Sequence, residues 1–427
     1  MDGEEQAPAR ARGGAAAGVD LRPPASASGR RAASPTSPLR RRIGVWLLLL
    51  TAFCFGLGQT VVFSILPAYA RAIDLSEFQV TMIFGCSALF WVTMSPRWGR
   101  RSDRVGRRPV VLIGLGAFVL GMVLFAGALG VAVSGALSSW GAFAVLVAGR
   151  CLHGAVASAG PAASQAYIAD RSSPAERTSA MAGYAAAFGT GTVVGPAIGG
   201  LGAVLGPVLP LLVVAATGAV SALLIWRFVP EATPPQARSD KAALRLTDPR
   251  LRTTLAYGLL SGIVTALQLQ FIGFYTIDTL GLGTAEGAAA TGVVLTGGAV
   301  ASLAAQLTVR FLRATTRRLM RVAPLLMLAG FVVITLGPSL PVIALGTVIS
   351  GFGLGASYPA FNADASLRVD TDEQGGAAGL AAAAGASGFA VVPVIGSAAY
   401  QAAPDGPFLL GLVAASVMAV LAWFRRA

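Results

Sequence analysis

Residues 78–130 read FQVTMIFGCSALFWVTMSPRWGRRSDRVGRRPVVLIGLGAFVLGMVLFAGALG, which is two long apolar runs joined by a short arginine-rich segment. The hydrocarbon core of a bilayer is about 30 Å thick, and a helix needs about 20 apolar residues to cross it. Each run is long enough, and the arginines between them would stay in water. This stretch therefore predicts two consecutive membrane-spanning helices.

The whole chain has the composition of a polytopic membrane protein. Of its 427 residues, 55% are hydrophobic and 12% are charged, and its mean hydropathy is +0.70. About a quarter of the residues in soluble domains are charged, so this composition excludes a soluble enzyme. The required length of apolar sequence predicts twelve spans in an all-α fold: 43–69, 78–97, 109–130, 139–169, 177–202, 206–228, 252–276, 285–310, 320–338, 341–367, 376–402 and 406–424.

The spans divide the chain into four parts. Residues 1–42 contain almost no large apolar side chain, so we expect a disordered basic tail on the cytoplasmic side. A six-helix bundle follows over 43–228. The polar stretch 229–251 is predicted to be a cytoplasmic linker, and a second six-helix bundle occupies 252–427.

The two bundles show weak internal similarity. An offset of 197 residues aligns Glu176 with Glu373 and Pro196 with Pro393. Two parallel six-helix repeats are typical of one large class of transporters, in which the substrate site lies between the repeats near the middle of the membrane.

The basic residues indicate the orientation. Nearly all of the 32 lysines and arginines lie on one side of the predicted spans, and the exceptions are Arg71 and Arg150. Cytoplasmic loops carry such an excess, so both termini are expected in the cytoplasm and the protein in the inner (plasma) membrane. The excess of basic residues in the loops on one side of the lipid bilayer accounts for the net charge of +13. No nucleic-acid partner is therefore expected.

Side chains suited to catalysis or metal binding are not clustered in the sequence. The three cysteines, Cys54, Cys86 and Cys151, lie within apolar runs, and His153 is the only histidine. There is also no nucleotide-binding loop. We therefore expect no enzyme activity, no metal and no cofactor.

The arginine-rich segment has the pattern G-x-x-x-D-R-x-G-R-R. Its glycines would permit a tight turn and a close approach of helices. Asp103 is a carboxylate among six arginines, and it could pair locally or hold this side shut against the positive end of a helix in the other half. The alternative is a basic loop that only fixes topology. The candidate conformational latch comprises Gly99, Asp103, Arg104, Gly106, Arg107 and Arg108.

A second group of candidates concerns coupling. Arg150 lies one turn before His153 within an apolar run, where a charge is costly and normally faces a polar cavity or a partner. Arg150 could instead extend to the membrane interface. His153 could titrate near neutral pH or serve only in packing. Asp278, near the outer end of its span, is the third coupling candidate.

The fifth span carries the pattern G-x-x-x-G-P-x-x-G-G. Small residues on successive turns let helices pack closely, and the proline frees a carbonyl group and bends the helix. We expect a structural role for this helix-packing motif, which consists of Gly191, Gly195, Pro196, Gly199 and Gly200.

These three patterns resemble the signature motifs of the major facilitator superfamily, and the third is similar to the signature of its drug:proton antiporters. The segments 167–177 and 368–375 also resemble the tetracycline-efflux-like branch. The resemblance implies a secondary transporter that exports small hydrophobic or amphipathic compounds by alternating access in exchange for protons. It also implies that Asp103 and its neighbouring arginines control the conformational equilibrium, and that Arg150 takes part in proton or substrate coupling.

Some positions depart from the family pattern. Arg101 stands where the loop motif usually has an apolar residue, and His153 stands where the helix motif usually has glutamine. The first span contains no acidic residue and offers only Gln59. A facilitator or importer of a small metabolite therefore remains an alternative, and a receptor that transports nothing is a more remote one.

Polar side chains within the spans are candidates for the lining of a substrate cavity. Apolar walls with a few polar groups would suit a small organic substrate. The candidates for the cavity lining are Gln59, Gln165, Gln268, Gln270, Tyr275, Tyr358 and Asn362.

The protein is expected to act as a monomer.

Overall fold

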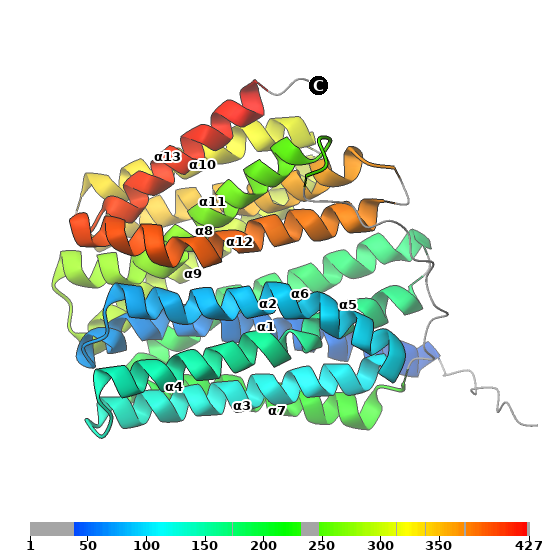
Figure 1. Cartoon of the computed structure of the whole chain (residues 1–427), viewed down its shortest axis with the longest axis horizontal. Coiled ribbons are helices and arrows are strands. Elements are labelled where there is room, and N and C mark those ends of the chain that lie inside the picture. Colours follow the sequence, from blue (N-terminus) through cyan, green and yellow to red (C-terminus); the bar gives the residue numbers. More distant parts are fainter. Residues whose placement is uncertain are drawn as a thin grey trace, which may run out of the picture. The chain divides into compact units, whose positions relative to one another are not determined.

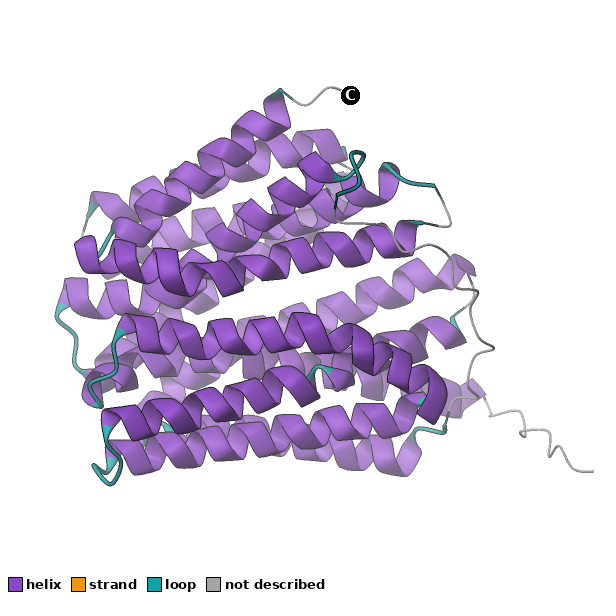
Figure 2. Cartoon of the chain, in the orientation of Figure 1, coloured by secondary structure: helices purple, strands orange, loops and turns teal. Residues whose placement is uncertain are grey.

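The computed structural model describes residues 38–172, 174–231, 247–312, 314–337, 339–370 and 373–424, and this part of the chain consists of helices and loops (Figures 1 and 2). A π-helical turn, η1 (His153–Ala157), joins α4 to α5, and a 3₁₀ turn, η2 (Ala203–Leu205), follows α6. The α-helices of the described residues are α1 (Pro38–Ala72), α2 (Glu77–Val105), α3 (Arg107–Val133), α4 (Ser139–Leu152), α5 (Ala159–Arg171), α6 (Pro174–Gly202), α7 (Val208–Phe228), α8 (Arg252–Leu280), α9 (Thr284–Leu312), α10 (Thr316–Leu336), α11 (Leu340–Leu367), α12 (Gln374–Ala402) and α13 (Gly406–Trp423).

Each of the twelve predicted spans corresponds to a helix, and the fourth corresponds to the continuous run from α4 through α5. Eleven of the described helices are long and apolar enough to cross a membrane. The remaining one, α6, has 29 residues but is rich in Gly, Ala and Thr, which lower its hydropathy. The prediction of an all-α membrane fold is confirmed.

Two predicted non-helical segments lie partly outside the described residues. Of the predicted tail, residues 1–37 are outside, whereas residues 38–42 belong to the first turns of α1. Of the predicted linker, residues 232–246 are outside.

The arginine-rich segment is helical for most of its length, which corrects our expectation of a loop. α2 continues to Val105 and ends at Gly106, whose φ of +102° strongly favours glycine. α3 begins at the next residue. Arginine is a good helix former, so polar residues beyond the apolar run extend the helix into water.

The two halves of the chain, α1–α7 and α8–α13, repeat the same packing. In the first half α1 packs along α6 and α3 along α7, and in the second half α8 packs along α12 and α10 along α13. The contacts between the halves follow the same symmetry, because α2 packs on α12 and α6 on α9. The predicted pair of six-helix repeats is therefore present as two similar bundles packed together.

The outside of the helices is apolar. Large side chains such as Trp140, Leu223 and Val413 are more than half exposed. Apolar surface on this scale is unfavourable in water and suits the hydrocarbon of a bilayer. The chain is a multi-pass membrane protein.

The bundle has two ends with different chemistry. We call the end that carries Arg97 to Arg108 the arginine-rich end, and the end that carries the α1–α2 turn, residues 73–76, the opposite end. The beginning of α1 and the end of α13 both lie at the arginine-rich end, on the right of Figure 1.

Candidate functional site

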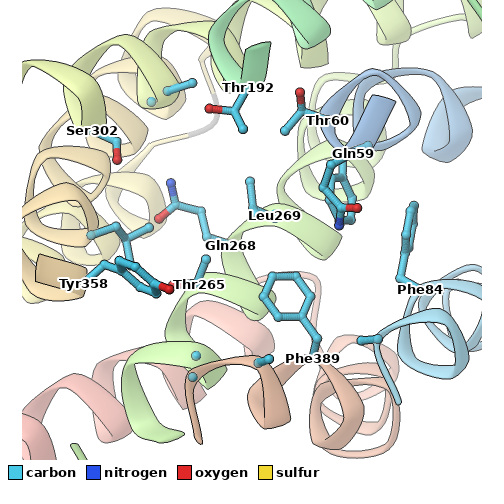
Figure 3. Close-up of a pocket in the computed structure, with 18 of the residues that line it drawn as sticks. Gln59, Thr60, Phe84, Thr192, Thr265, Gln268, Leu269, Ser302, Tyr358 and Phe389 are labelled. Atoms are coloured by element: carbon cyan, nitrogen blue, oxygen red, sulfur yellow. The ribbon is translucent and has the colours of Figure 1, made fainter. Parts of the chain in front are cut away.

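A cavity of about 450 Å³ lies between the two halves (Figure 3). Its walls come from α1, α2, α4 and α6 of the first half and from α8, α9, α11 and α12 of the second. This volume is within the range of small-molecule pockets, roughly 300–1,000 Å³. Much of the wall is aromatic and consists of Phe55, Phe63, Phe84, Trp91, Phe188, Phe361 and Phe389.

Three of the polar residues that we expected in the cavity line it. Gln59 enters from α1, Gln268 from α8 and Tyr358 from α11 (Figure 3). Oε1 of Gln268 is buried and has no hydrogen-bond partner within the described residues. A buried amide oxygen without a partner is costly, so this side chain is suited to binding a polar group of a ligand.

The other four candidates lie outside this lining. Gln165 is exposed on α5, and Gln270 is buried on another face of α8. Tyr275 donates a 3.1 Å hydrogen bond to a carbonyl oxygen of α10. Asn362 donates a 2.8 Å hydrogen bond to the preceding turn of its own helix. We therefore do not include these four in the cavity.

Arg150 is buried at the cavity wall and does not extend to the membrane interface. Only 2% of its surface is exposed. Its guanidinium carbon lies 5.3 Å from the centre of the Phe84 ring. Nε and Nη1 are buried without a hydrogen-bond partner in the described part of the chain. The arginine therefore presents a charge that no described carboxylate neutralises.

His153 begins the π-helical turn η1, three residues after Arg150. π-Turns within α-helices are rare and often occur at functional sites. The imidazole is 2% exposed and stacks on Trp91 at a centroid distance of 5.9 Å, with Phe118 at 5.8 Å. Its Nδ1 has no hydrogen-bond partner among the described residues. His153 thus lies directly behind the aromatic wall of the cavity.

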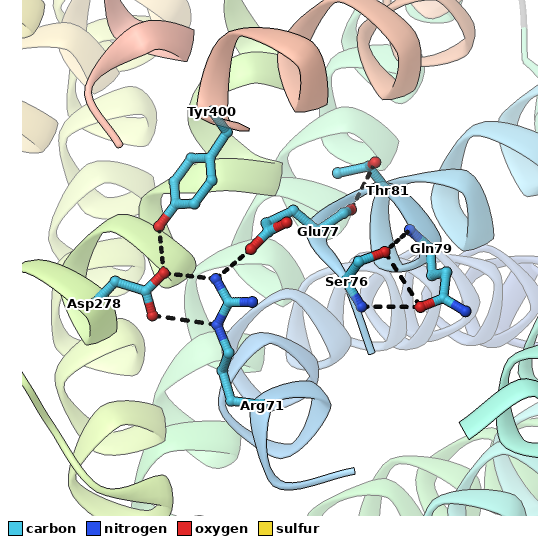
Figure 4. Close-up of polar contacts among 7 residues, drawn as sticks. All are labelled: Arg71, Ser76, Glu77, Gln79, Thr81, Asp278 and Tyr400. Atoms are coloured by element: carbon cyan, nitrogen blue, oxygen red, sulfur yellow. Dashed lines mark hydrogen bonds and ion pairs between the residues drawn. The ribbon is translucent and has the colours of Figure 1, made fainter. Parts of the chain in front are cut away.

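Asp278 belongs to a polar network at the opposite end (Figure 4). Its Oδ2 lies 2.5 Å from Nη2 of Arg71, and its Oδ1 accepts a 3.2 Å hydrogen bond from Nε of the same arginine. Tyr400 donates a 2.6 Å hydrogen bond to Oδ2, and Arg71 also pairs with Glu77. The network joins α1 and α2 of the first half to α8 and α12 of the second.

Further contacts hold the halves together at this end. The hydroxyl groups of Thr81 and Ser397 are 3.1 Å apart, between α2 and α12. On the other side of the bundle, a Cβ atom added to Gly200 of α6 would lie 3.1 Å from the Cα atom of Gly292 of α9. The opposite end of the cavity is therefore closed by direct packing and by hydrogen bonds between the halves.

At the arginine-rich end, Asp103 pairs within the first half. Its Oδ1 lies 2.5 Å from Nη2 of Arg107, whose Nε donates a 3.0 Å hydrogen bond to Asp170. Arg107 is 4% exposed, whereas the side chain of Asp103 is 49% exposed. Of the two roles considered for Asp103, local pairing is the one present in this conformation.

The remaining latch candidates differ in their surroundings. Arg104 is exposed, and Arg108 donates a hydrogen bond to the carbonyl oxygen of Trp226 on α7. Gly106 forms the turn and lies against the side chain of Glu231. Gly99 lies inside α2 with open space around it, so it contributes neither to the turn nor to a close helix contact.

The glycines of α6 pack against both halves. A Cβ atom at Gly191, Gly195 or Gly199 would collide with the backbone or the hydroxyl groups of α1. Gly200 meets α9, as described above. Pro196 lies between these two faces, lines the cavity, and its carbonyl oxygen lies close to Gly292. The motif places α6 in contact with both the neighbouring helix of its own half and the other half.

Comparison with known proteins agrees with this architecture. Residues 48–393 match the family model described as Major Facilitator Superfamily. The chain belongs to the major facilitator superfamily. Membership of this superfamily points to a transporter rather than an enzyme.

Two relatives and one solved structure illustrate the range of similarity to this major facilitator. It is 32% identical to the class D tetracycline resistance protein of Salmonella ordonez over 184 residues, which cover 43% of each protein. It is 26% identical to multidrug resistance protein 1 of Bacillus subtilis (strain 168) over 394 residues, which cover 90% of this chain and 97% of the relative. The match to the class D tetracycline resistance protein spans less than half of that protein's length. A solved structure of the human organic anion transporter MFSD10 (TETRAN) aligns with a TM-score of 0.64 at 21% identity and covers 89% of this chain and 99% of the other, which supports the fold alone.

Two features of this major facilitator were not predicted from its sequence. The network at the opposite end includes Arg71 and Tyr400, neither of which was a candidate. Arg71 carried a signal, because it stands apart from nearly all other basic residues on the other side of the membrane. The aromatic wall of the cavity carried none, because twenty phenylalanines are spread through a chain of apolar spans.

Proposed function

We propose that this protein is a proton-driven exporter of small hydrophobic or amphipathic compounds. The tetracycline and multidrug resistance proteins among its relatives support export of such compounds. The arginine-rich end would face the cytoplasm, in accordance with the excess of basic residues in cytoplasmic loops. Both termini would then be cytoplasmic, and we propose that the protein acts as a monomer in the plasma membrane.

The observation that carries this proposal is a cavity between two repeated bundles. The opposite end of this cavity is closed by contacts between the bundles, and these contacts can separate. Tyr358, on the half of α11 nearer the arginine-rich end, lines the cavity and leaves 56% of its surface exposed. This supports access from the arginine-rich end in the present conformation. Rocking of the halves would open the opposite end, which is alternating access.

We propose different parts for the three coupling candidates. Asp278 belongs to the network that holds the opposite end closed and is not among the residues that line the cavity. We assign it to gating. Arg150 and His153 lie at and behind the cavity wall, where a proton could influence substrate binding, and histidine is the side chain that ordinarily titrates near neutral pH. We assign proton coupling to these two.

His153→Gln tests this assignment. Glutamine keeps a polar side chain of similar size but does not titrate in the physiological range. In proteoliposomes loaded with a fluorescent neutral drug, we expect the variant to lose most of the stimulation by an imposed pH gradient. Exchange of labelled for unlabelled drug without a gradient should continue. Full stimulation by the gradient in His153→Gln would show that the proton binds elsewhere.

Facilitated transport without protons is the second candidate function. The described residues that line the cavity include no aspartate or glutamate, and intramembrane carboxylates commonly serve in the proton relays of transporters. Drug flux through the wild-type protein that ignores the pH gradient would favour this alternative. No flux of any drug would contradict export of this class of compound.

Asp103→Asn tests the proposed latch at the arginine-rich end. The substitution removes the charge that pairs with Arg107, at a half-exposed position where such pairs contribute less than about 1 kcal/mol to stability. We expect folded protein at close to the wild-type level and a clearly reduced rate of transport.

Asp74→Asn is the matched control for Asp103→Asn. Asp74 is an exposed aspartate at the opposite end with a φ of +55°, which asparagine tolerates. This variant should transport normally. Transport kinetics of Asp103→Asn equal to those of the control would refute the latch role.

A further inference from the structure

The charge of the cavity indicates the class of substrate. Arg150 is the one charged residue among the described residues that line it, and the other polar groups there are neutral amides and hydroxyls such as Gln59, Thr60 and Gln268. A cationic substrate would find no carboxylate in this lining. An anion would find a guanidinium.

The guanidinium of Arg150 is available to such a ligand. Two of its three nitrogens are buried without a partner in the described residues, and the nearest described interaction is the Phe84 ring. A buried charge is costly unless it is paired and hydrogen-bonded. Arginine binds carboxylates in a bidentate geometry with charge-assisted hydrogen bonds, so a carboxylate would satisfy the free donors.

The surroundings of Arg150 favour an aromatic body on that anion. The Phe84 ring of α2 lies 5.3 Å from the guanidinium carbon, and the rings of Phe55 on α1 and Trp91 on α2, whose centroids are 6.0 Å apart, also line the cavity. These rings offer flat apolar surface, and Ser87 adds a hydroxyl group to the lining. The cavity volume of about 450 Å³ matches a drug-sized molecule.

We propose that the cavity selects aromatic organic anions, with a carboxylate held by Arg150. This inference rests on the proposed transport function and adds the class of substrate. It depends on the geometry of the cavity and not on which ion drives transport.

The test compares three naphthalene compounds that share a ring system and differ in charge: naphthylacetate, naphthylacetamide and naphthylethylamine. Binding to the purified full chain in lipid nanodiscs is measured by equilibrium dialysis. We expect the carboxylate to bind about 10- to 100-fold more tightly than the amide, which is the range for a hydrogen bond to a charged group. The amine should bind most weakly. Equal affinities of the carboxylate and the amide, or tightest binding of the amine, would overturn the proposal.

Arg150→Gln should remove the preference for the carboxylate, and Arg150→Lys should retain part of it. Arg321→Gln is the matched control, because Arg321 also stacks on an aromatic ring, 4.7 Å from the centre of Trp423, outside the cavity. It should keep the wild-type preference. A preference that survives in Arg150→Gln would overturn the proposal, and the wild-type comparison decides the question if that variant does not fold.

Flux of the same compounds in proteoliposomes separates this inference from the proposed function. Transport of the amide or the amine without any preference for the carboxylate leaves a transporter and overturns the anion site. Binding of the carboxylate that depends on Arg150, without flux of any compound, supports the anion site and contradicts export.

Discussion

Asp278→Asn is expected to open the opposite end of the protein. The carboxylate of Asp278 accepts hydrogen bonds from Arg71 and Tyr400 and so holds helices of both halves together. Arg71 and Asp278 are each about one-third exposed, so the ion pair alone contributes little. With the charge-assisted bond from Tyr400, we expect a loss of about 1–2 kcal/mol, or roughly a 5- to 30-fold shift toward the open state.

Labelling of a cysteine at position 397 measures this shift. Ser397 lies on α12 at its contact with α2, near the closed end, and is 1% exposed. A cysteine at this position should therefore react with a water-soluble maleimide only when the end opens. The experiment uses Ser397→Cys with the three native cysteines replaced, in nanodiscs. Asp278→Asn should raise the rate of labelling by about the factor given above.

Asp405→Asn provides the control for Asp278→Asn. Asp405 precedes α13 at the same end of the same half and takes no part in the network. Its substitution should leave the labelling rate unchanged. If both variants label at the wild-type rate, Asp278 does not hold the end closed, and the gating role is wrong.

Gly195→Ala is expected to destabilise the packing of α6 on α1 strongly. The added Cβ atom would overlap the hydroxyl group of Thr60 and lie 2.7 Å from the carbonyl oxygen of Leu57. Backbone atoms cannot move aside as a flexible side chain can, so the helices must separate. Overpacking of this kind costs about 1–3 kcal/mol, and it should outweigh the gain of up to about 1 kcal/mol in helix propensity.

Gly183→Ala separates packing from helix propensity. Gly183 lies in the same helix with nothing within 4 Å of an added Cβ atom, so alanine there should slightly stabilise the protein. We expect the thermal unfolding temperature in detergent to fall for Gly195→Ala and to stay equal or rise for Gly183→Ala. A fall of equal size in both variants would mean that α6 does not depend on close contact at Gly195.

The helices of this protein were predictable from sequence because a bilayer imposes strict requirements. A span must satisfy its backbone hydrogen bonds internally and must be long enough to cross. From these requirements alone, residues 109–130 and 406–424 can be predicted to form helices, without information about the helices that pack against them. Over Arg97 to Val105 the apolar run ends before the helix does, because arginines continue the helix.

The cavity was less predictable because its lining depends on the neighbours of each helix. Gln268 and Gln270 are two residues apart on α8, and only Gln268 lines the cavity. Helical spacing separates their directions by about 200° but does not say which direction meets the other half. The network around Asp278 likewise requires the two repeats to be packed together before its members meet.

The proposed transport of an anion held by Arg150 would have an electrical consequence. Across a membrane with a negative interior, the outward movement of a monoanion is favoured by about 2.3 kcal/mol of free energy per 100 mV. This free energy corresponds to about a 50-fold ratio of the outside to the inside concentration of the anion. Exchange for an inward-moving proton would add a second charge movement of the same sign. The membrane voltage would then drive export on its own, and an ionophore that collapses the voltage would slow efflux even where the pH gradient persists.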